Sequence, residues 1–108
     1  AGKIKALAVT TAKRTAFAPE LPTIAESGVP GFEAATWYGF NGPRGMPAAA
    51  VNILNREIHA ALKTDIRDKL VTLGVDLAPG TPQQFGDYVR SEIAKWRGII
   101  KVANISEP

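Results

Sequence analysis

Side chains able to do acid–base, nucleophilic or metal chemistry are sparse in this sequence. The single histidine, His59, has Asn55, Arg56 and Lys63 at helical spacing, which predicts a solvated residue on a polar face and not a catalytic base. Cysteine is absent, so thiolate metal sites and cysteine nucleophiles are excluded. A metal site needs several converging ligands, and no cluster of histidines and carboxylates supplies them. We therefore predict no catalytic site, no cofactor and no metal.

Two further patterns superficially resemble reactive sites. The glycines of Gly39–Gly45 have neither dinucleotide-loop nor P-loop spacing and are interrupted by Pro43, which predicts a turn between a strand and a helix. Asp65 and Asp68 could be a pair of catalytic carboxylates. They come at the start of a predicted helix beside Lys69, where the helix dipole and an ion pair explain them. Neither pattern predicts an enzyme.

Three short segments have the character of β-strands. Ile4–Thr10 is partly alternating and then continuously apolar, which suits a strand that is half exposed at its start and buried at its end. Trp37–Phe40 is rich in aromatic residues, which favour strands. Val75–Ala78 is a weaker candidate.

A short helical turn is predicted near Thr23–Ser27. Thr23 and Glu26 are spaced as a capping box, in which the hydroxyl and the carboxylate each accept a hydrogen bond from the other residue's backbone N–H. Gly28 follows at once, as expected for a left-handed residue that ends a helix.

Three longer helices are predicted further along the chain. The first begins at Pro47, and the second begins at Thr64 and stops at Gly74. The third has a cap, an N1 proline and an N3 glutamine at Thr81–Gln84, and runs to about Ala103. Its apolar stripe comprises Phe85, Tyr88, Val89, Ile93, Trp96 and Ile100. Lying on this stripe, Trp96 should be largely buried.

Composition indicates a soluble globular domain. The chain has 108 residues, of which 45% are hydrophobic and 21% are charged. No apolar run approaches the ~20 residues that span a bilayer. The net charge is +3, but the basic N-terminal cluster is followed directly by glutamates. Nucleic-acid binders concentrate basic side chains on one stripe with aromatic residues between them, so we predict no nucleic-acid partner.

Four motifs in order carry a resemblance to a known family. They are Gly2–Thr10, the long stretch Leu21–Glu33, Trp37–Phe40 followed by Gly42-Pro43, and Gly80–Pro82 before the long helix. Together they resemble the solute receptors of tripartite tricarboxylate transporters, often called Bug-type receptors. The similarity covers essentially the whole chain.

The resemblance implies an α/β fold that forms part of a two-lobed, type II-like periplasmic-binding-protein clamp. Residues 1–36 would belong to the second lobe, residues 37–43 to a crossover strand and hinge, and residues 44–108 to the first lobe. Such a receptor captures a small organic anion in the periplasm and delivers it to the membrane permease subunits of the transporter. Its precursor would carry a signal peptide, and it would not be an enzyme.

The resemblance also suggests ligand-binding residues. Thr10 and Thr11 would stand at the end of a strand that faces the cleft, and Trp37 would stand at the crossover. Strand-end capping is an equally good explanation for the threonines, and packing is a good one for the tryptophan.

Two alternative functions remain open. The chain could be a fragment of an α/β enzyme whose catalytic residues lie upstream, or a ligand-sensing lobe that feeds a sensor kinase. A separate expectation concerns assembly. Because the edges of Ile4–Thr10 and the stripe from Phe85 to Ile100 need covering surfaces, the chain alone could form a strand- or helix-exchanged homo-oligomer.

Overall fold

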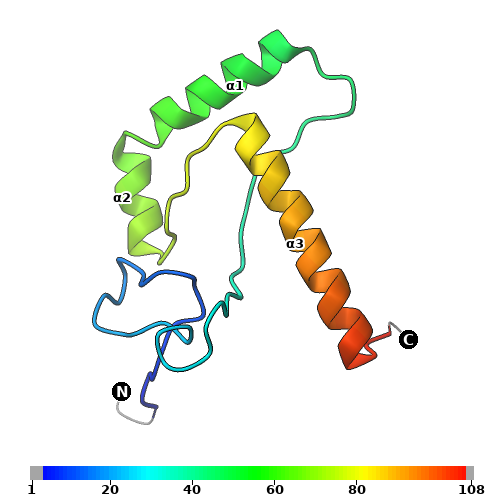
Figure 1. Cartoon of the computed structure of the whole chain (residues 1–108). Coiled ribbons are helices and arrows are strands. Elements are labelled where there is room, and N and C mark those ends of the chain that lie inside the picture. The colour runs from blue at the N-terminus through cyan, green and yellow to red at the C-terminus, as the bar shows by residue number, and fades with distance from the viewer. Residues whose placement is uncertain (1–3, 107–108) are drawn as a thin grey trace. The chain divides into compact units, whose positions relative to one another are not determined.

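The structure is a computed structural model that describes residues 4–106. Within these residues the regular secondary structure consists of α1 (Ala48–Ala61), α2 (Asp65–Thr72) and α3 (Pro82–Ala103), shown in Figure 1. The described chain before α1 consists of turns, bends and irregular segments, with one isolated bridge. The three predicted helices are thus confirmed.

The chain divides into two compact units. One contains Ala1–Phe40 with His59–Ala78, and the other contains Asn41–Ile58 with Pro79–Pro108. The units do not coincide with the predicted lobes, because residues 59–78 belong with the N-terminal stretch. The lobes describe an intact clamp, and their division at residues 37–43 stays a prediction.

The ends of α3 follow from local side-chain and backbone chemistry. The Thr81 hydroxyl accepts the Gln84 N–H at 3.1 Å, and the Gln84 side-chain oxygen accepts the Thr81 N–H at 2.8 Å. Pro82 occupies the first helical position, where its missing N–H costs nothing. Asn104 ends the helix in the left-handed conformation, with φ 51°. Both predicted ends are confirmed.

The other two helices also begin and end near their predicted limits. α1 starts one residue later than predicted, because Pro47 is the N-cap: its carbonyl accepts the Val51 N–H at 3.2 Å. Thr64 caps α2 by accepting the Ile66 N–H at 3.4 Å. Gly74, with φ 78°, follows the end of α2 as predicted.

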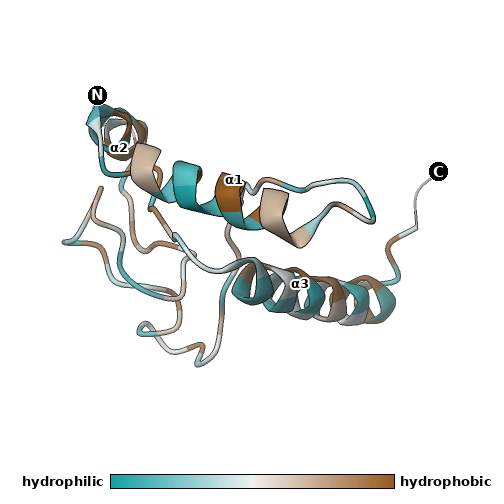
Figure 2. Ribbon diagram, turned by 90° about the horizontal axis from the view of Figure 1, so that it is seen from above, coloured by the Kyte–Doolittle hydropathy of each residue, from teal (hydrophilic) through white to brown (hydrophobic). Residues whose placement is uncertain are grey.

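The apolar sides of the helices stay partly open to solvent. Figure 2 shows apolar and polar residues alternating along α1 and α3. Among the described residues no hydrophobic side chain is buried, and Trp96 is 40% exposed. The prediction that Trp96 is largely buried is therefore wrong for this chain. A helical stripe is buried only where another surface covers it. Ile4 is also exposed, and the exchanged oligomer stays a prediction.

The three predicted strands are not formed. Residues 4–10, 37–40 and 75–78 have no ladder, and the β-pairing within residues 4–106 is a single parallel bridge between Val9 and Thr23. A strand exists only when a neighbour accepts and donates its backbone hydrogen bonds. Strand propensity alone therefore does not produce a sheet in these segments.

Candidate ligand-binding site

The two candidate threonines open a bend that we call the threonine loop, Thr10–Lys13. Thr10 is exposed, and its carbonyl accepts the Ala34 N–H at 2.9 Å. Thr11 is partly buried, and its hydroxyl donates to the Lys13 carbonyl at 2.6 Å. The loop therefore presents two hydroxyl groups and the exposed Lys13 within four residues. Hydroxyls and a cation are groups that can bind a carboxylate.

The start of the threonine loop is held by the bridge at Val9. The Val9 N–H donates to the Pro22 carbonyl at 2.9 Å, and the Val9 carbonyl accepts the Ile24 N–H at 3.0 Å. These bonds link the loop to the turn Thr23–Ser27, which we call the cap turn.

The cap turn has the hydrogen bonds of a capping box. The Thr23 hydroxyl accepts the Glu26 N–H at 3.0 Å, and a Glu26 carboxylate oxygen accepts the Thr23 N–H at 2.8 Å. The Ser27 hydroxyl donates to the Thr23 carbonyl at 2.8 Å. The predicted capping box is confirmed, but the segment is a series of turns and not a helix, because Gly28 (φ 116°) ends it at once.

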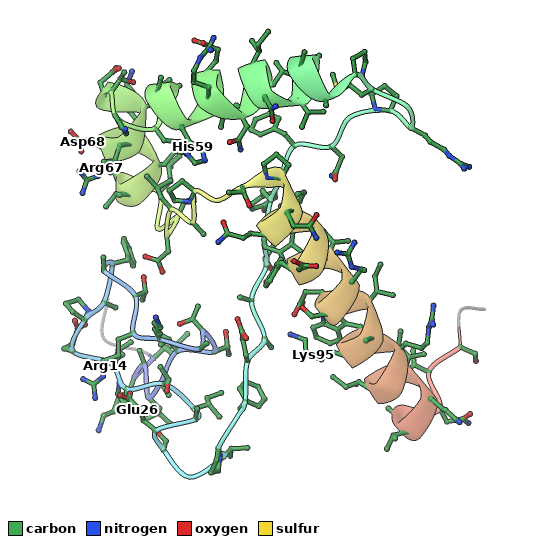
Figure 3. The ribbon with its side chains drawn as sticks, turned by 45° about the horizontal axis from the view of Figure 1, so that its top comes forward. Arg14, Glu26, His59, Arg67, Asp68 and Lys95 are labelled. Atoms are coloured by element: carbon green, nitrogen blue, oxygen red, sulfur yellow. The ribbon has the colours of Figure 1, made fainter. Side chains whose placement is uncertain are left out.

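Burial and charge distinguish this turn from an ordinary surface loop. Thr23 is only 2% exposed. The same oxygen of Glu26 that accepts the Thr23 N–H also accepts the Arg14 Nε–H at 3.0 Å (Figure 3). The hydrogen bond from the Thr23 backbone, followed by that from Arg14, lowers the pKa of Glu26 below its usual value.

Arg14 is a residue that the sequence reasoning did not select. Its Nε–H group faces Glu26, and its Nη1 group donates to the Pro19 carbonyl at 3.4 Å. The available signal was the basic N-terminal cluster followed by glutamates, which indicates ion pairs but does not tell which residues pair. Partners 12 residues apart in a loop can be assigned only from the structure.

The third candidate, Trp37, lies in the same unit as the threonines. It follows Ala34, whose N–H donates to the Thr10 carbonyl, by three residues along a segment without regular structure. The residue is 38% exposed. The structure therefore joins the Trp37 segment to the backbone of the threonine loop. A ligand-binding role for the three residues stays a prediction.

The remaining reactive side chains have structural surroundings. His59 has intermediate exposure in the last turn of α1, so it is less open to solvent than a residue on a fully polar face, and it lies where a basic group suits the helix dipole. Asp65 and Asp68 lie in the first turn of α2, and Asp65 accepts from Lys69 at 2.7 Å, as predicted. The segment at Gly45 is a turn, also as predicted.

Within residues 4–106, no group of three or more histidine and carboxylate side chains is placed to hold a metal ion. None of the helices in this part of the chain is long and apolar enough to cross a membrane.

Comparison with solved structures defines the class of protein. Rpa4515 from R. palustris, solved with adipate, matches with a TM-score of 0.73 and 44% sequence identity, covering 97% of this chain and 36% of that one. The periplasmic binding protein BugD matches with a TM-score of 0.75 and 32% identity, covering 99% of this chain and 37% of that one. The chain thus matches part of the fold of a two-lobed periplasmic binding protein, as predicted, although within residues 4–106 the strands of an α/β sheet are not formed.

Sequence comparison then defines the family. The model of the tripartite tricarboxylate transporter family receptor matches residues 1–105, and this chain belongs to that family. A protein of the tcbD–tcbE intergenic region in Pseudomonas sp. (strain P51) is 41% identical over 102 residues, which are 93% of this chain and 30% of that protein. BugT of Bordetella pertussis is 31% identical over 101 residues, 93% of this chain and 31% of BugT. The chain spans about 30% of the length of these relatives.

Proposed function

We propose that this chain is part of an extracytoplasmic receptor that captures a small carboxylate for a tripartite tricarboxylate transporter. The family match over residues 1–105 carries the proposal. It is supported by the 44% identity to a protein solved with adipate, a dicarboxylate. The ligand class is a di- or tricarboxylate, an amino acid or an aromatic acid. The receptor works in the periplasm, and its precursor carries a signal peptide.

Thr10, Thr11 and Trp37 contribute to the ligand site in this proposal. A hydroxyl group rotates freely, so Thr11 can exchange the Lys13 carbonyl for a carboxylate oxygen without moving the backbone. The exposed Thr10 can donate a second hydrogen bond to the same anion. Trp37 supplies a flat apolar surface for the carbon skeleton of the anion.

The receptor acts by binding and release, not by chemical turnover. The anion closes the two lobes, because it binds the closed form better than the open one. The closed form then delivers the anion to the permease subunits in the membrane. We expect no conversion of the bound carboxylate, and neither a cofactor nor a nucleic acid takes part.

A thermal-shift screen of the full-length protein against a panel of organic acids tests the receptor function. A ligand that binds the folded state raises the melting temperature. Absence of any shift across the panel, or conversion of a carboxylate that one point mutation abolishes, would contradict the proposal.

The site itself is tested with the acid that gives the largest shift. Thr11→Val removes the hydroxyl and keeps the shape, so it should weaken binding by roughly tenfold, the usual loss for one hydrogen bond to a charged group. Thr72→Val, on the exposed side of α2, is the matched control and should leave the Kd unchanged. Unchanged affinity in both Thr10→Val and Thr11→Val would move the site elsewhere in the receptor.

A further inference from the structure

Both ends of the threonine loop are attached to the same short turn. At the start of the loop, the backbone of Val9 pairs on both sides of Thr23, with bonds of 2.9 and 3.0 Å. Directly after the loop, Arg14 donates to Glu26 at 3.0 Å. Thr23 and Glu26 are themselves joined by two reciprocal hydrogen bonds. The loop is therefore closed at its base by a network that runs from Val9 through the cap turn to Arg14.

Glu26 is the shared member of this network. One of its oxygens, Oε2, accepts both the Thr23 N–H at 2.8 Å and the Arg14 Nε–H at 3.0 Å. The side chain of Arg14, directly after the threonine loop, and that of Glu26, in the cap turn, lie next to each other (Figure 3). The lowered pKa of Glu26 agrees with this double role, because both bonds favour the ionised carboxylate.

We propose that Arg14 and Glu26 are positioning residues that hold the threonine loop in its binding conformation without contacting the bound anion. This inference rests on the proposed function, since it presumes that the threonine loop binds the anion. Arg14 acts through the ion pair, because its Nε and Nη1 groups already donate to Glu26 and to the Pro19 carbonyl. The positive charge of Arg14 is thus matched by a carboxylate within the protein.

The physical reason is pre-organisation. A loop that is disordered before binding must lose conformational freedom when the ligand binds, and this cost weakens affinity. The backbone bonds at Val9, together with that from the Ala34 N–H to the Thr10 carbonyl, hold the start of the loop. Without the Arg14–Glu26 ion pair the far end keeps the weaker bond from Arg14 to the Pro19 carbonyl at 3.4 Å and gains freedom to move, and the Thr11 hydroxyl with it. The two side chains are 48% and 49% exposed, so the expected effect is that of a solvent-screened pair.

The first measurement is hydrogen exchange at the backbone amides of residues 11–13 in the ligand-free, full-length protein. Glu26→Gln keeps an oxygen that can accept the Thr23 N–H but removes the charge that faces Arg14. Both Arg14→Gln and Glu26→Gln should speed exchange at these amides, and the double variant should add little to either single change. Arg56→Gln breaks a comparable exposed ion pair with Glu57 on α1 and is the matched control.

The second measurement is the Kd for adipate and for the acid that gives the largest thermal shift. Arg14→Gln and Glu26→Gln should each weaken binding about two- to fivefold, as the loss of an exposed pair predicts, with little change in the melting temperature of the ligand-free protein. Arg14→Lys keeps the charge and should restore part of the affinity. Arg56→Gln should leave the Kd unchanged.

The outcomes separate the failure of this inference from the failure of the proposed function. Unchanged exchange in the loop overturns the positioning role, whatever the Kd shows. Faster exchange with an unchanged Kd shows that the ion pair orders the loop but that the loop does not bind the anion. That result overturns both the positioning role and the site at Thr10 and Thr11, while the receptor function stands. A parent protein that binds none of the acids overturns the receptor proposal and this inference with it.

Discussion

The long helix α3 and the N-terminal loops of this chain are held together in different ways. The hydrogen bonds at the start of α3 join residues three positions apart, as between Thr81 and Gln84. In the loops, the Thr10 carbonyl accepts from Ala34, and Arg14 donates to Glu26. A helix can form wherever its own sequence favours it, whereas the loops need partners that are distant in the sequence.

Burial differs between the two regions as well. In the loops the cap turn buries Thr23 to 2% exposure. On α3, Trp96 and Ile93 remain 40% and 52% exposed. The exception on α3 is Glu92, which is 5% exposed and accepts the Trp96 indole N–H at 2.9 Å. Among the described residues, the buried side chain of each region, Thr23 in the loops and Glu92 on α3, is thus polar and hydrogen-bonded.

The largest expected effect concerns Trp96. Trp96→Ala removes the indole that donates to the buried Glu92 carboxylate and that lies under Lys95, whose Nζ is 5.4 Å from the ring centroid. The free energy of unfolding of the full-length protein should fall by roughly 2–3 kcal/mol. This is less than for a fully buried tryptophan because 40% of the residue is exposed.

Denaturant unfolding measures this loss, and Val102→Ala is the control on the same helix. Val102 is 89% exposed, so its truncation should cost less than about 0.5 kcal/mol. Equal losses in the two variants would show that Trp96 makes no contribution beyond that of a surface residue.

A smaller loss of stability is expected when the capping threonine of either capping box is removed. Thr23→Ala should cost about 1–2 kcal/mol, because the turn that it caps also pairs with Val9. Thr81→Ala should cost about 0.5–1 kcal/mol, because α3 can fray by one turn without disturbing other segments. Serine at either position keeps the hydroxyl and should restore most of the stability. A larger loss at Thr81 would reverse the comparison between the two regions.

The smallest effect is the pH dependence contributed by Glu26. Because the folded state lowers the pKa of this carboxyl, the protein gains stability above the unfolded-state pKa and loses it as the pH falls through the folded-state value. Glu26→Gln should therefore flatten the decrease in the urea midpoint between neutral and acidic pH. Arg14→Gln should flatten it less, because the Thr23 N–H, the larger cause, stays in place. An identical pH profile for the parent and Glu26→Gln would show that the pair does not form in solution.

The candidate site shows how far sequence patterns reach. The capping box of Thr23 and Glu26 was predictable from a spacing of three residues, since both partners lie within one turn. The role of Glu26 as the partner of Arg14 was not predictable, because any of several nearby charges could have formed the pair. The helical turn predicted there was also wrong. The residues between the cap at Thr23 and the stop at Gly28 are too few for a helix, and they form turns instead.

The sequence by itself determined the three helices, their caps and the family, because these depend on neighbouring residues or on residue order. It also predicted strands at residues 4–10 and 37–40, since β-branched and aromatic residues favour them, but these strands are not formed. Only the tertiary structure decided that Val9 pairs with Thr23 and that Arg14 faces Glu26. It also left the stripe around Trp96 partly open. Strand pairing, ion-pair partners and burial each depend on a second segment of chain, and local residue preferences do not specify which segment that is.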